Sequence, residues 1–127
     1  MHSAGLTISE TAARTALSAY TLRYYEDEGL LLSIARDEAG HRRYSERDIE
    51  WIGMVMRLKS TGMPIEDIRR YAHLCRVGEQ PDERLALLQR HRDRIDAVVQ
   101  QSLTHLAAID AKIDGYLSEE GEQRPVA

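Results

Sequence analysis

Residues 7–29 read TISETAARTALSAYTLRYYEDEG, and this stretch predicts two short helices joined by a tight turn. Thr7 and Glu10 have the spacing of a capping box, in which each side chain bonds the backbone amide of the other at a helix start. Ser18 is a good N-cap for a second helix, and Gly29 suits the left-handed residue that follows a helix end. Two helices joined by such a turn form a helix-turn-helix.

The segment that follows predicts a two-stranded hairpin. Residues 30–34 are mostly apolar and fit a strand, residues 37–40 (DEAG) are a turn signal, and residues 41–44 can return as the second strand. A hairpin after a helix-turn-helix is called a wing. Ser45 then predicts the cap of a third helix, and Pro64 predicts the first residue of a fourth.

The segment from Asp82 to Ser118 predicts one long helix with an apolar seam. Apolar and aromatic side chains recur at alternating intervals of three and four residues, which is typical of a coiled coil. At about 1.5 Å per residue this helix is about 55 Å long. The preceding head is too small to cover such a seam, so we expect the helix to pair with its own copy. The expected dimerisation residues are Leu88, Ile95, Val99, Leu106, Ile109 and Ile113.

Composition limits the function classes. The 127 residues are 30% charged with a net charge of −4, which argues against a protein that coats nucleic acid by bulk charge but leaves room for a local basic patch. No apolar stretch approaches the roughly 18 residues of a membrane span. The single cysteine, Cys75, excludes an internal disulfide, and a cytoplasmic protein is expected. The scarcity of glycine and proline favours helices and excludes an all-β sandwich.

The second predicted helix carries side chains that suit a DNA groove. Small and hydroxyl-bearing residues near its start allow close approach to a major groove. Leu22 and Tyr25 are expected to pack inward. Arg23 can serve a phosphate or a guanine edge, or it can pair with Glu26 or Asp27 on a solvated face. The side chains expected on exposed faces are Tyr20, Thr21, Arg23 and Tyr24.

A second basic cluster lies in the predicted wing and at the start of the third helix. Its members are Arg36, Arg42, Arg43 and Arg47. Strand alternation puts Arg42 and Tyr44 on one face and His41 and Arg43 on the other. An arginine on a hairpin can reach a phosphate or a minor groove. The alternative is a charged hairpin whose arginines only prevent edge pairing.

Several motifs, in their order and spacing, resemble the MerR family of bacterial transcription regulators. The resemblance covers residues 6–72, and the long helix resembles the dimerisation helix of that family by its pattern. The chain is most similar to the short members that end just past the coiled coil, without a separate effector domain. The motifs are LRYYE (22–26), EGL (28–30), GHRRYS (40–45), DI (48–49) and LKSTGMPIEDI (58–68).

The resemblance implies a mainly α fold in three parts. Residues 1–76 would form a winged helix-turn-helix DNA-binding domain whose third and fourth helices act as a connector. Residues 77–118 would form the coiled-coil dimerisation helix, and residues 119–127 a flexible tail. One departure concerns the turn, where the usual glycine is Ala16. A left-handed alanine costs about 1 kcal/mol, so we expect the turn to differ there.

The resemblance also implies a partner and a mechanism. Members of the family act as homodimers, with an antiparallel coiled coil, on pseudo-palindromic promoters with an overlong spacer. They bend and untwist the spacer so that RNA polymerase engages both promoter elements. By the family motif, the DNA-contacting residues are Tyr20, Thr21, Arg23 and Tyr24 in the recognition helix, with His41, Arg42 and Arg43 in the wing.

The nature of the signal is less determined by the sequence. The metal sensors of the family use several cysteines near the end of the dimerisation helix, whereas this chain has Cys75 alone, so no metal and no cofactor are expected. We expect Cys75 to pack as a small apolar residue under the fourth helix; a redox or electrophile sensor is the alternative. If an unknown small-molecule effector exists, we expect it to bind a small pocket between head and coil; the alternative is that the protein has no effector.

The sequence bears differently on three other classes of protein. An enzyme is not expected, because the sequence has no phosphate loop, nucleophile elbow or metal-spaced His/Glu pair. A coiled-coil protein whose head binds another protein is compatible with the net charge. A DNA-shaping protein of the excisionase kind is a closer alternative, although the long self-pairing helix argues against it. The sequence leaves open the inducer, the operator sequence and the direction of regulation.

Overall fold

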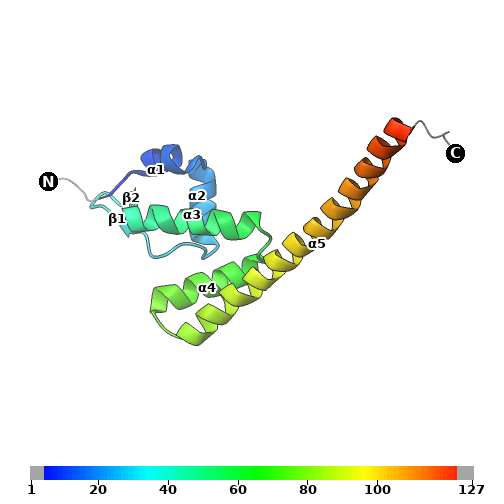
Figure 1. The fold of residues 1–127 in the computed structure, drawn as a ribbon. Helices are drawn as coiled ribbons and strands as arrows, with labels where there is room; N and C mark the ends of the chain where they lie inside the picture. Colours follow the sequence, from blue (N-terminus) through cyan, green and yellow to red (C-terminus); the bar gives the residue numbers. More distant parts are fainter. Residues whose placement is uncertain (1–4, 123–127) are drawn as a thin grey trace. The chain divides into compact units, whose positions relative to one another are not determined.

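The computed structural model describes residues 5–122 and is mainly α-helical, as predicted (Figure 1). The chain divides after Leu88 into two units; the first is called the head here. In chain order the elements are α1 (Ile8–Thr15), α2 (Ala19–Asp27), β1 (Ala35–Arg36), β2 (Arg42–Arg43), α3 (Glu46–Ser60), α4 (Ile65–Val77) and α5 (Pro81–Glu122).

Side-chain caps start the first three helices, and the predicted capping residues are confirmed. At α1, Thr7 Oγ1 accepts from the Glu10 amide at 3.1 Å while Glu10 Oε1 accepts from the Thr7 amide at 2.9 Å. These bonds hold the pKa of Glu10 below its usual value. Ser18 caps α2. At α3 the same reciprocal pair forms between Ser45 and Asp48, with bonds of 2.8 and 3.0 Å.

The turn between α1 and α2 corrects one expectation. Ala16 adopts a left-handed conformation, with φ 61° and ψ 18°. The prediction that alanine would change the turn is therefore wrong: the backbone keeps the conformation that favours glycine, and alanine carries a strain of about 1 kcal/mol. Thr15 supports the turn, because its hydroxyl oxygen accepts from the Leu17 amide at 3.3 Å.

The prediction of a strand over residues 30–34 is also wrong. Leu30 and Leu31 are both buried in the core of the head, and strand pairing begins only at Ala35. Side chains satisfy the loop carbonyls that a neighbouring strand would otherwise bind. Trp51 Nε1 donates to the Leu30 carbonyl at 2.8 Å, and Arg76 Nη1 donates to the Leu31 carbonyl at 2.6 Å. Residues of this loop are apolar because they are buried in the core, and not because they pair in a sheet. This explains why the sequence pattern predicted a strand.

The wing is present as a very short antiparallel hairpin. Ala35 pairs with Arg43, and Arg36 with Arg42. Tyr44 continues beyond the hairpin and forms a bridge with Leu6, with two backbone hydrogen bonds of 2.7 and 2.8 Å. The N-terminal segment thus closes the base of the wing.

Gly5 explains how the backbone of this segment comes so close to the wing. A Cβ atom at Gly5 would lie 2.8 Å from the Tyr44 carbonyl oxygen, and φ at Gly5 is +97°. Both observations exclude an ordinary side chain at this position.

The core of the head joins its helices and the loop after α2. Trp51 of α3 stacks on Tyr71 of α4, with ring centroids 5.5 Å apart and an interplanar angle of 11°. Arg14 of α1 binds Glu46 of α3 through two hydrogen bonds of 3.1 and 3.0 Å. Pro64, predicted as the first residue of the fourth helix, is instead its N-cap, so α4 starts one residue later, at Ile65. The largest fully buried side chains are Tyr44, Leu22, Leu30, Ile52, Ile68, Val55 and Thr11.

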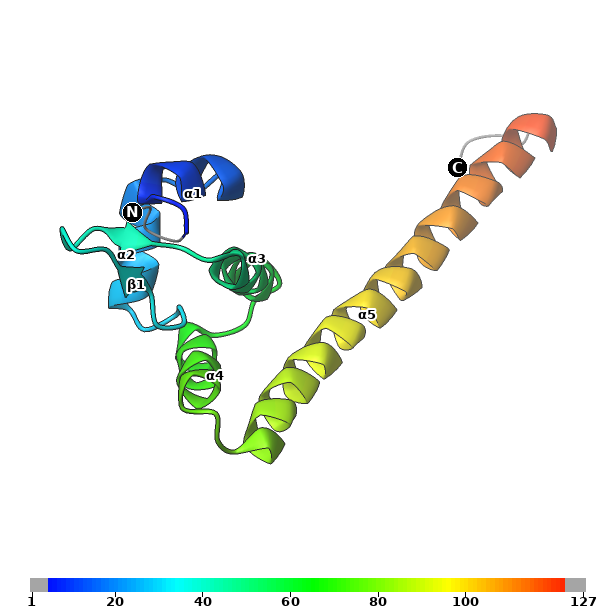
Figure 2. The ribbon, with the colours of Figure 1, turned by 90° about the vertical axis from the view of Figure 1, so that its left-hand side faces the viewer.

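Helix α5 is unbroken from Pro81 to Glu122 and passes the predicted end at Ser118 (Figure 2). Residues 123–127 of the expected tail lie outside the described residues. In the single chain, Leu88 and Ile95 are half-buried. The four later seam residues are exposed: Val99, Leu106, Ile109 and Ile113. No helix among residues 5–122 combines the length and apolar character that crossing a membrane requires.

Candidate nucleic-acid interface

Helix α2 presents a polar and aromatic face to solvent. Tyr20 is 76% exposed and Tyr24 39% exposed, and Arg23 is exposed between them. Leu22 and Tyr25 lie on the opposite side and are buried, as their spacing predicted. The burial of these two residues fixes the rotation of α2, so the three outward side chains are held by the core and not by a loop.

Thr21 differs from its expected exposed position. Its side chain is half-buried, and its hydroxyl oxygen accepts a hydrogen bond of 3.0 Å from Ser18 Oγ. The same Ser18 oxygen accepts from the Thr21 amide at 3.0 Å. The helix cap therefore draws Thr21 toward the turn, although its hydroxyl proton can still be donated outward.

Arg23 does not pair with either of the carboxylates considered from the sequence. Within the part of the chain that the structure describes, no carboxylate lies within 4.0 Å of its guanidinium nitrogens, and no hydrogen bond involves its side chain. Glu26 instead points to the wing. An exposed arginine with its whole donor fork available is suited to a phosphate or a guanine.

The wing arginines each bind a carboxylate. Arg42 Nε donates to Glu26 Oε1 at 2.5 Å, and this bond raises the pKa of Arg42 above its usual value. Arg36 Nη2 lies 3.8 Å from Glu26 Oε2. Arg43 Nε donates to Asp37 Oδ2 at 3.3 Å. Both Arg42 and Arg43 are half-buried, so these pairs hold the guanidinium groups in defined places.

Asp37 also fixes the turn of the hairpin. Its Oδ1 accepts from the backbone amides of Ala39 at 3.0 Å and His41 at 2.9 Å. The amide of His41 is the main cause that holds the pKa of Asp37 below its usual value. The imidazole of His41 is exposed, with Nδ1 3.9 Å from the same oxygen. His41 thus lies at the outer end of the wing.

Sequence reasoning missed Glu26 and Asp37 as partners of the wing arginines. Strand alternation predicted that Arg42 and Arg43 lie on opposite faces, and in the structure the two arginines bind different carboxylates. Glu26 belongs to α2 and Asp37 to the hairpin turn. The missing information was the distance in space between α2 and β2, which local spacing does not contain.

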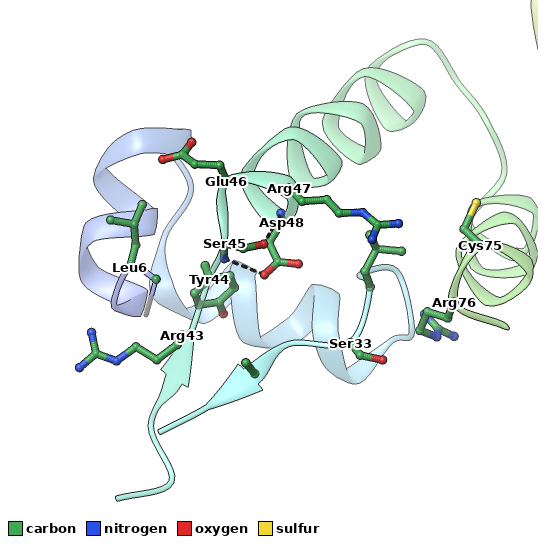
Figure 3. Close-up of a pocket in the computed structure, with 13 residues that line it drawn as sticks. Leu6, Ser33, Arg43, Tyr44, Ser45, Glu46, Arg47, Asp48, Cys75 and Arg76 are labelled. Atoms are coloured by element: carbon green, nitrogen blue, oxygen red, sulfur yellow. Dashed lines mark hydrogen bonds between the residues drawn. The ribbon is translucent and has the colours of Figure 1, made fainter. Parts of the chain in front are cut away.

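A hollow of about 780 Å³ lies within the head between the base of the wing, the start of α3 and the end of α4. Tyr44 and Ser45 line one side, and Cys75 and Arg76 of α4 line the other (Figure 3). The Tyr44 hydroxyl is buried and has no hydrogen-bond partner among the described residues, and burial raises its pKa. Cys75 is half-buried on this wall, so its expected place under α4 is only partly closed to solvent.

Among residues 5–122, no three or more histidine, cysteine, aspartate or glutamate side chains gather into a metal-binding group.

The sequence and the fold are both similar to known regulators. A model of the MerR HTH family regulatory proteins matches residues 6–74. An uncharacterised HTH-type transcriptional regulator of Haemophilus influenzae is 34% identical over 111 residues, which span 87% of this chain and 82% of that protein. YyaN of Bacillus subtilis, also described as an uncharacterised HTH-type regulator, is 30% identical over 124 residues, or 87% of this chain and 90% of that protein.

Solved structures agree with the sequence matches. HiNmlR, described as a MerR family regulator that lacks the sensor domain and is bound to promoter DNA, is 33% identical with a TM-score of 0.76, over 91% of this chain and 92% of that one. A MerR family regulator from Bacillus thuringiensis is 29% identical with a TM-score of 0.71, over 87% and 98% of the two chains. With its winged head, its long last helix and these relatives, the chain belongs to the MerR family of helix-turn-helix transcriptional regulators.

Proposed function

We propose that this chain is a sequence-specific DNA-binding transcription regulator that acts as a homodimer. The observation that carries the proposal is the outward face of α2, on which Arg23 has no ion-pair partner within the described residues while the core fixes the helix rotation. The relative HiNmlR, described as bound to promoter DNA and lacking a sensor domain, supports the same partner.

The recognition helix and the wing have different roles in this proposal. Tyr20, Thr21, Arg23 and Tyr24 of α2 enter the major groove and read bases. His41, Arg42 and Arg43 of the wing contact the flanking phosphate backbone, where an arginine fork matches phosphate oxygens. Because the net charge of the chain is −4, no general positive field replaces these few cations.

The dimer is formed by α5 in an antiparallel coiled coil. The exposed apolar residues Val99, Leu106, Ile109 and Ile113 supply the seam, together with Leu88 and Ile95. Exposed apolar side chains at heptad spacing are unfavourable in water and favour pairing with a second helix. Two heads joined in this way would bind the halves of a pseudo-palindromic site.

The dimer acts on the promoter by distorting the spacer DNA between the two elements that RNA polymerase recognises. We propose that an unidentified stress or small-molecule signal changes this distortion, and that the protein works in the cytoplasm without catalytic activity. Residues 1–76 serve DNA binding and residues 77–118 dimerisation. Footprinting on the promoter upstream of its own gene, with and without stress compounds, tests the response: a changed cleavage pattern in the spacer is expected.

A salt series on DNA affinity tests the assignment of residues. Arg42→Ala and Arg43→Ala should each weaken binding to operator and scrambled duplexes about equally. Each should also lower the slope of log affinity against log salt by roughly one unit for each lost phosphate contact. Substitution of Tyr20 or Thr21 should instead change which operator bases are tolerated. Arg90→Ala, an exposed arginine of α5, is the matched charge control.

The proposal has a clear contrary result. If wild-type affinity and slope persist in both wing variants, the wing is only a solvated hairpin and its assignment to DNA is withdrawn. If the wild-type protein shows no salt-dependent binding to its own upstream DNA, the head binds another kind of partner and the regulator assignment fails.

A further inference from the structure

Glu26 lies where α2 meets the wing. Its Oε1 accepts a hydrogen bond of 2.5 Å from Nε of Arg42 on β2, and its Oε2 lies 3.8 Å from Nη2 of Arg36 on β1. The Glu26 side chain is 24% exposed and that of Arg42 is 20% exposed, so solvent screens their attraction less than at an open surface. One carboxylate of α2 therefore contacts both strands of the wing.

The wing needs a contact of this kind because its sheet is so small. Each strand has two residues, and a two-stranded hairpin alone is only marginally stable in water. Asp37 orders the turn within the hairpin through the amides of Ala39 and His41. Those bonds do not relate the hairpin to α2, whereas the Glu26 contacts do.

The Glu26 contact uses one edge of the Arg42 guanidinium and leaves another edge available. Arg42 donates to Glu26 through Nε, and neither Nη atom donates a hydrogen bond to any of the described residues. A guanidinium has five N–H donors in a rigid plane, so it can bind a carboxylate on one edge and a phosphate on another. The ion pair thus orients Arg42 without using its whole donor set.

We propose that Glu26 is a positioning residue for DNA binding: it sets the wing against α2 and aims the Nη atoms of Arg42 at the phosphate backbone. The inference rests on the proposed DNA-binding role of the wing. The proposal also predicts that removing this negative charge weakens DNA binding, which is the opposite of the usual effect. A carboxylate near DNA repels phosphates, so removing a plain negative charge strengthens binding, whereas removing a positioning carboxylate weakens it.

The test compares Glu26→Gln with Asp27→Asn. Asp27 is the next residue and is exposed; it forms no hydrogen bond or ion pair with the described residues and acts on Arg42 only through the longer-range attraction of its charge, so its substitution removes the same charge without breaking a contact. Dissociation constants for an operator duplex are measured across a salt series, well below the thermal midpoints of both variants. Glu26→Gln should weaken binding roughly tenfold and lower the salt slope, while Asp27→Asn should leave affinity unchanged or raise it.

The same substitution in an Arg42→Ala background completes the test. Without Arg42 there is no guanidinium to aim, so Glu26→Gln should no longer weaken binding and should raise affinity slightly. If Glu26→Gln strengthens operator binding in the wild-type background, or only lowers the thermal midpoint at unchanged affinity, Glu26 is not a positioning residue. If Arg42→Ala itself leaves affinity and slope unchanged, the proposed role of the wing fails instead.

Discussion

The guanidinium of Arg76 binds the carbonyl oxygen of Leu31 across 45 positions of sequence, with Nη1 donating at 2.6 Å. The same nitrogen donates to the Gly29 carbonyl at 3.0 Å. The last turn of α4 thus holds the loop that connects α2 to the wing. The sequence predicted that this apolar segment is a strand. In the structure a charged side chain, and not a neighbouring strand, binds these loop carbonyls.

Arg76→Ala should lower the free energy of unfolding of the head by about 1–2 kcal/mol, because two loop carbonyls lose a charged donor. Arg76→Lys should recover only part of the loss, because an ammonium group lacks the reach and the planar fork of arginine. Urea denaturation measures both. Arg90→Ala, on the exposed surface of α5, should change stability little. Equal stability of Arg76→Ala and wild type would contradict this role.

Ala16→Gly should raise the free energy of unfolding by up to about 1 kcal/mol, because glycine adopts the observed left-handed conformation without strain. The same substitution at Ala13, inside α1, should lower stability by about as much, since glycine weakens a helix interior. Urea denaturation should therefore show that the same substitution raises the free energy of unfolding at Ala16 and lowers it at Ala13. Destabilisation at both positions would mean that the turn carries no strain.

Val99→Asp combined with Ile109→Asp should convert the dimer to a monomer. Each aspartate would place a charge in the proposed apolar seam, at several kcal/mol per dimer. Sedimentation velocity measures the change. Gln101→Asp adds the same charge on another face of α5 and should leave a dimer. A tight dimer in the double variant would show that another surface forms the interface.

The wing should loosen when the pH falls. Hydrogen bonds hold the pKa of Asp37 below its usual value near 3.9 in the folded protein. A lowered folded pKa adds stability that is fully present above the unfolded value and is lost as the pH falls through the folded value. Urea denaturation from pH 7 to pH 3 should therefore show a constant difference between wild type and Asp37→Asn above about pH 5 that shrinks below about pH 4. A difference that stays constant to pH 3 would contradict this source of stability.

Local signals in the sequence predicted much of the head. Thr7 with Glu10, and Ser45 with Asp48, start helices through contacts only three residues apart, so their spacing predicts them directly. The inward face of α2, with Leu22, follows from helical periodicity in the same way. These elements depend on neighbours along the chain, which a sequence displays.

The parts that were not predicted depend on contacts between distant segments. The loop of residues 30–34 is apolar like a strand, but Trp51 and Arg76 bind its carbonyls from other helices. The pairing of Arg42 with Glu26 spans 16 positions and two kinds of element. A pattern gives the type and face of such residues, whereas the identity of their partners depends on how the helices pack. The roles in DNA contact and in the seam stay predictions until they are measured.

Trp51 is the single tryptophan of the chain, and its surroundings make it a natural optical probe. Its indole is stacked on Tyr71 and bound to the Leu30 carbonyl, so its emission spectrum depends on how α3, α4 and the loop after α2 fit together. The seam residues of α5 from Val99 onward include no other indole. Emission from this chain consequently reports the opening of the head separately from the dissociation of two chains, without an added dye.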